Sequence, residues 1–109
     1  FPSGSASLSN SGKSALQSVA DVLLRDHGDG TYWIEGHTDT DRISKSKFRN
    51  NRDLAAQRAL SVLEHLVMEC DVPDESCVLV SHGPYMPLAD NNSKEGKAKN
   101  RRVEIVVHK

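Results

Sequence analysis

Apolar residues recur every three or four positions in two stretches of the chain, and this period predicts two amphipathic helices. The first stretch covers residues 14–25, and the second covers residues 50–68, where Asn50 or Asn51 offers an N-cap. The side chains expected to face the core are Leu16, Val19, Ala20, Leu23 and Leu24 in the first helix, and Ala55, Ala59, Val62, Leu63, Leu66 and Val67 in the second.

Three shorter runs are rich in β-branched residues and predict strands. They cover residues 31–35, 77–81 and 102–108, and a short helical turn is expected near residues 94–99. Loops are expected over residues 1–10, 36–47 and 82–92, which are rich in Gly, Pro, Ser or other polar residues. The alternation of helices with strands predicts an α/β (α+β) sandwich, whose helices pack on one face of a small mixed β-sheet.

The length of 109 residues suffices for one domain and not for two, so residues 1–109 are expected to form a single domain that begins in a leading loop. Because the first residue is Phe1 rather than Met, we expect a piece of a longer protein. Charged residues make up 27% and apolar residues 37%, which is typical of a soluble globular fold. No run approaches the roughly 18 apolar residues of a membrane span.

The formal net charge of −1 conceals an alternation of charged blocks. Residues 1–39 carry a net charge of −3, residues 40–60 of +4, residues 61–90 of −6 and residues 91–109 of +4. The near-zero total and the five aromatic residues argue against a nucleic-acid-binding protein. Each basic block is either a solvated surface or part of a site for an anion.

Cysteines and histidines give no motif for catalysis or for a cofactor. Cys70 and Cys77 fit either a small disulfide-closed loop or free buried thiols. The histidines lack the HExxH spacing of zinc proteases, and the chain has no GxSxG motif. A zinc-dependent hydrolase that uses His37, His82 and an acid remains a minor alternative. We expect no enzyme activity and no cofactor.

Three polar segments are candidates for a binding site: residues 35–39, the helix positions Asn51 and Arg58, and Asn100-Arg101-Arg102, which is either solvated charge or an anion site. Asp39 follows a predicted strand, where rigid scaffolds often display functional side chains. Arg58 interrupts the apolar face of the second helix and is either paired inside the protein, with Asp39 or Asp53, or directed at a bound anion. It shares one side of that helix with Asn51, roughly 10 Å away along the axis.

Three motifs in order along the chain resemble the OmpA-like C-terminal domain, a family of peptidoglycan-binding modules. They are Ile34-Glu35-Gly36-His37-Thr38-Asp39, Asn51-x-x-Leu54-x-x-x-Arg58-Ala59 and Asn100-Arg101-Arg102-Val103-Glu104-Ile105. The long loop before Phe48 and Asn51 is more similar to the MotB type than to the shorter OmpA and peptidoglycan-associated lipoprotein types. The family carries a strand before Phe1, so the first strand is expected to be truncated. Ser81-His82-Gly83 departs from the family pattern.

The resemblance implies non-covalent binding of the diaminopimelate in the peptide stems of peptidoglycan, without catalysis. Asp39 would take the ammonium of diaminopimelate and Arg58 its carboxylate. The remaining ligand-binding residues that the resemblance implies are Thr38, Asn51, Arg101 and Asn100.

The resemblance also implies a setting and an alternative function. The domain would lie in the periplasm of a bacterial cell envelope and would anchor a membrane-attached parent protein to the wall, with peptidoglycan as its partner. Alternatively, it would mainly form a homodimer or dock a partner in a MotB-type stator or another envelope complex, with weak wall binding.

Overall fold

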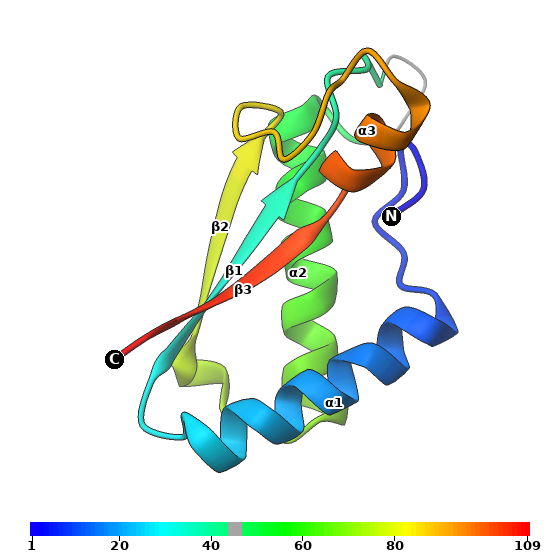
Figure 1. Cartoon of the computed structure of the whole chain (residues 1–109). Coiled ribbons are helices and arrows are strands. Elements are labelled where there is room, and N and C mark those ends of the chain that lie inside the picture. Colours follow the sequence, from blue (N-terminus) through cyan, green and yellow to red (C-terminus); the bar gives the residue numbers. More distant parts are fainter. Residues whose placement is uncertain (44–46) are drawn as a thin grey trace.

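The computed structural model describes residues 1–43 and 47–109 (Figure 1). Within these residues, the helices and strands follow one another in the predicted order. Their bounds are α1 Asn10–Asp26, β1 Thr31–His37, α2 Asn51–Glu69, the 3₁₀ turn η1 Asp74–Ser76, β2 Cys77–Gly83, α3 Lys94–Asn100 and β3 Val103–His108. Part of the loop expected over residues 36–47 lies outside the described residues.

The described strands form one mixed sheet in the order β2-β1-β3. The central strand β1 runs parallel to β2, which follows it through the crossover helix α2, and antiparallel to β3. Side chains of α1 and α2 share one core with Tyr32 and Ile34 of β1, so these two helices cover the same face of the sheet. Helix α3 lies instead at the end of the sheet where β1 finishes (Figure 1). The predicted mixed sheet with helices on one face is therefore confirmed.

Fewer side chains of α1 are buried in the core than the sequence pattern predicts. Leu16, Ala20 and Leu23 are buried, whereas Val19 and Leu24 at the margins of the predicted stripe are each 38% exposed. In α2 the buried set includes Ala55, Ala59, Val62 and Leu66, as predicted, and also Leu54 and Arg58. The core is closed by Tyr32, whose hydroxyl donates a hydrogen bond to the carbonyl of His27 at 2.8 Å.

Side-chain caps determine where the helices begin. Ser9 accepts a hydrogen bond from the backbone N–H of Gly12, so α1 begins four residues before the predicted start. Asn50, rather than Asn51, caps α2 by accepting a hydrogen bond from the N–H of Asp53 at 2.8 Å. Asn51 is therefore the first helical residue, and its side chain is available to the neighbouring loop.

Two strands extend into segments that the sequence pattern assigned to loops. Gly36 and His37 belong to β1, and α2 packs so closely on Gly36 that a Cβ there would overlap the carbonyl of Ala55. His82 and Gly83 belong to β2, where Gly36 pairs with Ser81 but His37 pairs with Gly83. His82 is therefore an extra residue in β2, a bulge at the same end of the sheet as Asp39.

Both cysteines are free thiols, which decides between the two alternatives left open by the sequence. Cys70 is 3% exposed in the core, and Cys77 packs at its edge. Burial raises the pKa of each thiol above its usual value.

In the described part of the chain, no helix combines the length and the apolar character that a membrane span requires.

Candidate functional site

The Asp39 carboxylate lies just beyond β1 and is 4% exposed. Its Oδ2 accepts a hydrogen bond from Nη1 of Arg101 at 2.9 Å, and its Oδ1 accepts one from the N–H of Asp41 at 3.0 Å. Arg101 ends helix α3, so the first and third sequence motifs meet in this ion pair. The side chain of Arg101 remains 17% exposed and is the more accessible partner.

The Arg58 side chain is completely buried and donates to three backbone carbonyls. Its Nε donates to Ser5 at 2.8 Å, its Nη2 to Pro2 at 2.9 Å and its Nη1 to His37 at 3.1 Å. Among the described residues it forms no ion pair, so the internal pair with Asp39 or Asp53 that the sequence allowed is not the arrangement found. Burial lowers the pKa of Arg58 to about 10, while the nearby charge of Asp39 acts in the opposite direction. The guanidinium is still protonated at neutral pH.

Residues 1–9, the N-terminal segment, cover the guanidinium of Arg58. The ring of Phe1 lies 5.3 Å from its central carbon, within the range of a cation–π contact. Arg101 holds the same segment, because its Nε donates to the carbonyl of Phe1 at 2.8 Å. The segment thus bridges the two arginines. Sequence reasoning did not assign it this role because it acts through backbone carbonyls, which leave no signal in the choice of residue.

Thr38 and Asn51 border the Asp39 loop. Thr38 donates from Oγ1 to the carbonyl of Asp39, and its N–H donates to the carbonyl of Gly83. Asn51 donates from Nδ2 to the carbonyl of Asp41 at 3.1 Å. Its Oδ1 is buried and has no hydrogen-bond partner among the described residues. Asn51 therefore offers one unsatisfied acceptor beside Asp41, the residue whose N–H bonds the Asp39 carboxylate.

Asn100 lies close to Arg101 but faces the loop before α3. Its Oδ1 accepts from the N–H groups of Leu88 and Ala89, and its Nδ2 donates to the carbonyl of Ala89 and to Oδ1 of Asn91. These four bonds use the full capacity of the amide. Asn100 therefore positions the loop and α3, and has no group left for a ligand.

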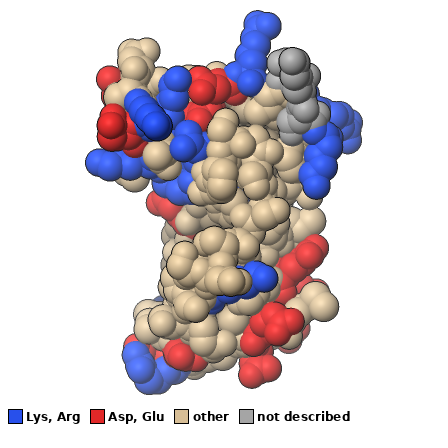
Figure 2. Space-filling model, turned by 90° about the vertical axis from the view of Figure 1, so that its right-hand side faces the viewer, with Lys and Arg blue, Asp and Glu red and all other residues tan. Residues whose placement is uncertain are grey.

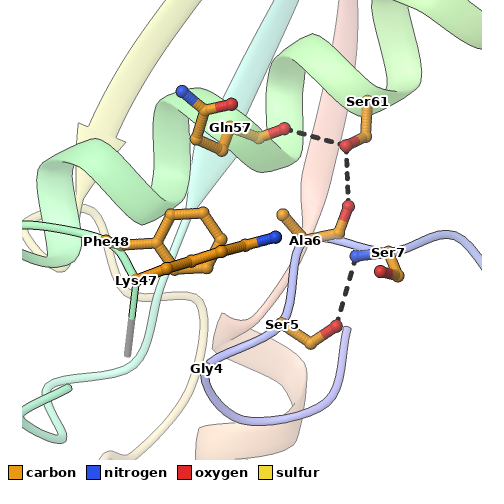
Figure 3. Close-up of a pocket in the computed structure, with 8 residues that line it drawn as sticks. All are labelled: Gly4, Ser5, Ala6, Ser7, Lys47, Phe48, Gln57 and Ser61. Atoms are coloured by element: carbon orange, nitrogen blue, oxygen red, sulfur yellow. Dashed lines mark hydrogen bonds between the residues drawn. The ribbon is translucent and has the colours of Figure 1, made fainter. Parts of the chain in front are cut away.

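A hollow of about 420 Å³ lies between the N-terminal segment and α2. In Figure 3 the side chains of Lys47 and Phe48 close one side of it, and Ser61 of α2 faces Ala6 across it. The hydroxyl of Ser61 donates to the carbonyl of Ala6 at 2.7 Å, which fastens the segment to the helix. No sequence signal marks this hollow, because Gln57 is the only lining residue within the three motifs and it stands at a position that the motif leaves open.

Charge is distributed unevenly over the surface. On the face shown in Figure 2, Lys and Arg side chains gather at the upper end, with some acids among them, whereas acids prevail at the lower right. The upper end carries α3 and the described residues just before α2, which belong to the two basic sequence blocks (Figure 1). The basic blocks thus converge on the end that holds Asp39, Arg58 and Arg101.

Comparison with protein families matches residues 1–101 to the OmpA family. The chain belongs to this family. Over 108 residues it is 38% identical to the peptidoglycan-binding protein ArfA of Mycobacterium tuberculosis, covering 99% of the chain and 31% of ArfA. The chain spans less than half the length of ArfA and of the relatives from Bacillus subtilis, Helicobacter pylori and Escherichia coli that it matches.

Two solved structures show which branch of the OmpA family the chain is similar to. The C-terminal domain of Helicobacter pylori MotB has a TM-score of 0.95 at 26% identity and covers 100% of this chain and 82% of that one. The peptidoglycan-associated lipoprotein of Burkholderia pseudomallei has a TM-score of 0.82 at 28% identity, with coverages of 99% and 86%. The resemblance to the MotB type is therefore confirmed.

Proposed function

We propose that this OmpA-family domain binds peptidoglycan non-covalently and has no catalytic role. One observation carries the proposal: the buried guanidinium of Arg58 lacks a carboxylate partner among the described residues, while Asp39 is paired with Arg101. The three side chains together carry a net charge of +1. Only neutral backbone carbonyls compensate the charge of Arg58 among the described residues, so an anionic group would be a stronger partner for the cluster. The proposal is supported by two relatives, one named a peptidoglycan-binding protein (ArfA) and the other a peptidoglycan-associated lipoprotein (from Burkholderia).

The chemistry of the cluster favours the free amino-acid end of diaminopimelate. That group presents an ammonium and a carboxylate on the same carbon, and its recognition requires an anion beside a planar cation. Asp39 would accept the ammonium, and Arg58 and Arg101 would hold the carboxylate. The unsatisfied Oδ1 of Asn51 would accept an N–H of the peptide, and Thr38 would contribute a neutral hydrogen bond.

A ligand can reach the guanidinium of Arg58 only if the N-terminal segment moves away from it. The carbonyl oxygens of Pro2 and Ser5 occupy the positions on the guanidinium that carboxylate oxygens would take. A ligand carboxylate would exchange these neutral acceptors for charged ones, which form stronger hydrogen bonds. Each such bond contributes about 1.5–3 kcal/mol. After the cost of displacing the segment, we expect roughly micromolar affinity for one domain.

Sedimentation with purified cell-wall sacculi tests the proposal. Asp39→Asn and Arg101→Gln should each remove most of the pelleted protein. Asp26→Asn and Arg25→Gln are matched controls, because they alter an exposed ion pair on α1 in the same chemical way. They should pellet as the unmodified chain does. Circular dichroism verifies that each variant is folded. Folded Asp39 and Arg101 variants that pellet like the controls would refute wall binding at this site.

A second comparison tests the ligand itself. Walls with lysine in place of diaminopimelate lack the side-chain carboxylate but keep the ammonium. The domain should therefore pellet with diaminopimelate-type sacculi and much less with lysine-type sacculi, and free diaminopimelate should release it. Equal pelleting with both walls would contradict the diaminopimelate assignment while leaving wall binding intact. In the cell, the domain would then tether a periplasmic envelope protein to the wall.

A further inference from the structure

Three side chains with metal-binding chemistry meet on the face of the sheet that α1 and α2 leave uncovered. Glu35 and His37 are two residues apart in β1, so they share a face opposite to Ile34 and Gly36, which face the helices. His82 belongs to the neighbouring strand β2. One ligand atom from each of the three lies within 4.8 Å of the others.

The imidazole of His37 is the most unusual member of this cluster. Its side chain is 3% exposed, yet neither ring nitrogen has a hydrogen-bond partner among the described residues. Its Nε2 lies 3.2 Å from Oε2 of Glu104, outside hydrogen-bonding geometry. Buried polar groups in native proteins are nearly always satisfied, and an exception calls for a water, an ion or a functional role. An unpartnered nitrogen at this place points to a ligand.

His82, the extra residue of the bulge in β2, lies on the same face of the sheet as the other two residues. Because His37 pairs with Gly83, the extra residue His82 leaves the regular ladder. Its ring then stacks on that of His37, with 4.9 Å between the centroids. Its Nε2 lies 2.7 Å from Oε1 of Glu35. Tetrahedral zinc with ligand bonds of about 2.0–2.1 Å separates its ligand atoms by about 3.3 Å. The separation of 2.7 Å between His82 and Glu35 and the limit of 4.8 Å for all three ligand atoms lie on either side of this value. Small side-chain rotations would therefore bring the three atoms to the spacing that zinc requires.

The charges around the cluster are compatible with a cation. Arg102 is the nearby basic residue, and it is already neutralised by Glu104, to which its Nη2 donates at 2.6 Å. Glu35 remains as a carboxylate for the metal. Both Glu35 and His82 are partly exposed, at 19% and 28% of their side chains, so an ion can enter from the open face of the sheet.

We propose that Glu35, His37 and His82 form a binding site for a divalent transition-metal ion, with Zn²⁺ as the preferred ion. Two imidazoles and one carboxylate form a ligand set suited to Zn²⁺ and poorly suited to Mg²⁺ or Ca²⁺. The ion would join β1 to β2 beside the Asp39 loop and would satisfy Nε2 of His37. This site is separate from the proposed wall-binding cluster and does not depend on wall binding.

Calorimetric titration of the metal-free chain with ZnCl₂ tests the site. We expect one saturable equivalent of Zn²⁺ and a higher midpoint of thermal unfolding in its presence. His82→Asn and Glu35→Gln alter partly exposed ligands and spare the buried His37, so these variants should remain folded. Each should weaken binding by more than about tenfold. His108→Asn, which alters an exposed histidine at the far end of β3, should bind like the unmodified chain.

Cobalt(II) distinguishes this site from binding by the cysteines. Co²⁺ in the Glu35, His37 and His82 site should give visible d–d bands without a thiolate charge-transfer band, and Zn²⁺ should displace it. Three results would each overturn the proposal: no saturable Zn²⁺ binding, a thiolate charge-transfer band, or undiminished binding in both His82→Asn and Glu35→Gln.

Discussion

Replacing Arg58 by Lys tests the structural role of its guanidinium while keeping its charge. The three carbonyls that it bonds come from Ser5, Pro2 and His37, at 2.8–3.1 Å, and they surround a planar fork. A lysine ammonium is a point donor at the end of a flexible stem and can reach about one of the three. Two bonds from a charged donor are then lost.

Each of these bonds is worth about 1.5–3 kcal/mol. Because two carbonyls left without a donor can regain some contact with water, we take the lower end. Arg58→Lys should therefore reduce the free energy of unfolding by about 3 kcal/mol. Two of the three bonds hold residues 1–9, so the loss of one or both should also let this segment detach before the rest of the domain unfolds.

Urea unfolding followed by the fluorescence of Trp33, the single tryptophan, measures the free energy. Limited proteolysis measures release of the N-terminal segment. Arg25→Lys is the matched control, since Arg25 is exposed and pairs with Asp26 on α1. It should change the free energy by no more than about 0.5 kcal/mol. A loss below about 1 kcal/mol for Arg58→Lys, with the segment still protected, would refute this account.

Three other substitutions or measurements probe the surrounding fold. Gly36→Ala should lower the free energy of unfolding by about 2–3 kcal/mol in the same urea assay, because its Cβ would overlap the Ala55 carbonyl; unchanged stability would contradict the close packing. Asn100→Ala removes four hydrogen bonds and should cost about 3 kcal/mol, seen as a fall in thermal midpoint of roughly 10 °C or more. Cys70 should react with iodoacetamide only after unfolding, whereas Cys77 should react slowly in the folded chain; a mass spectrum showing a native disulfide would contradict the free thiols.

The sequence pattern was sufficient to predict the helices and strands, because buried residues in this fold recur at the regular spacing of each element. Leu16, Ala20 and Leu23 recur at helical spacing and are all buried. The pattern was insufficient at strand ends. Gly36 suggests a turn by composition, yet it extends β1, because the approach of α2 needs a residue without a side chain. Such a requirement arises from tertiary packing and is invisible to local propensity.

The charged residues of the candidate site were predictable from the sequence, but the ion pair that they form was not. Asp39, Arg58 and Arg101 stand out by residue type and by motif. Which arginine pairs with Asp39 depends on where α3 ends, and the sequence alone does not determine that position. The carbonyls of Pro2 and Ser5 could not be anticipated at all, because every residue has a backbone carbonyl.

The hydrogen bonds between Phe1 and Arg101 connect residues 100 positions apart. Contacts between residues so far apart in sequence slow folding, because the entropy of loop closure is lost before they form. A chain that leaves a ribosome or a membrane channel with its N-terminus first therefore cannot assemble the cluster until residue 101 has emerged. Binding competence would then follow the folding of this whole domain, and a domain still partly inside a channel would not be captured by the wall.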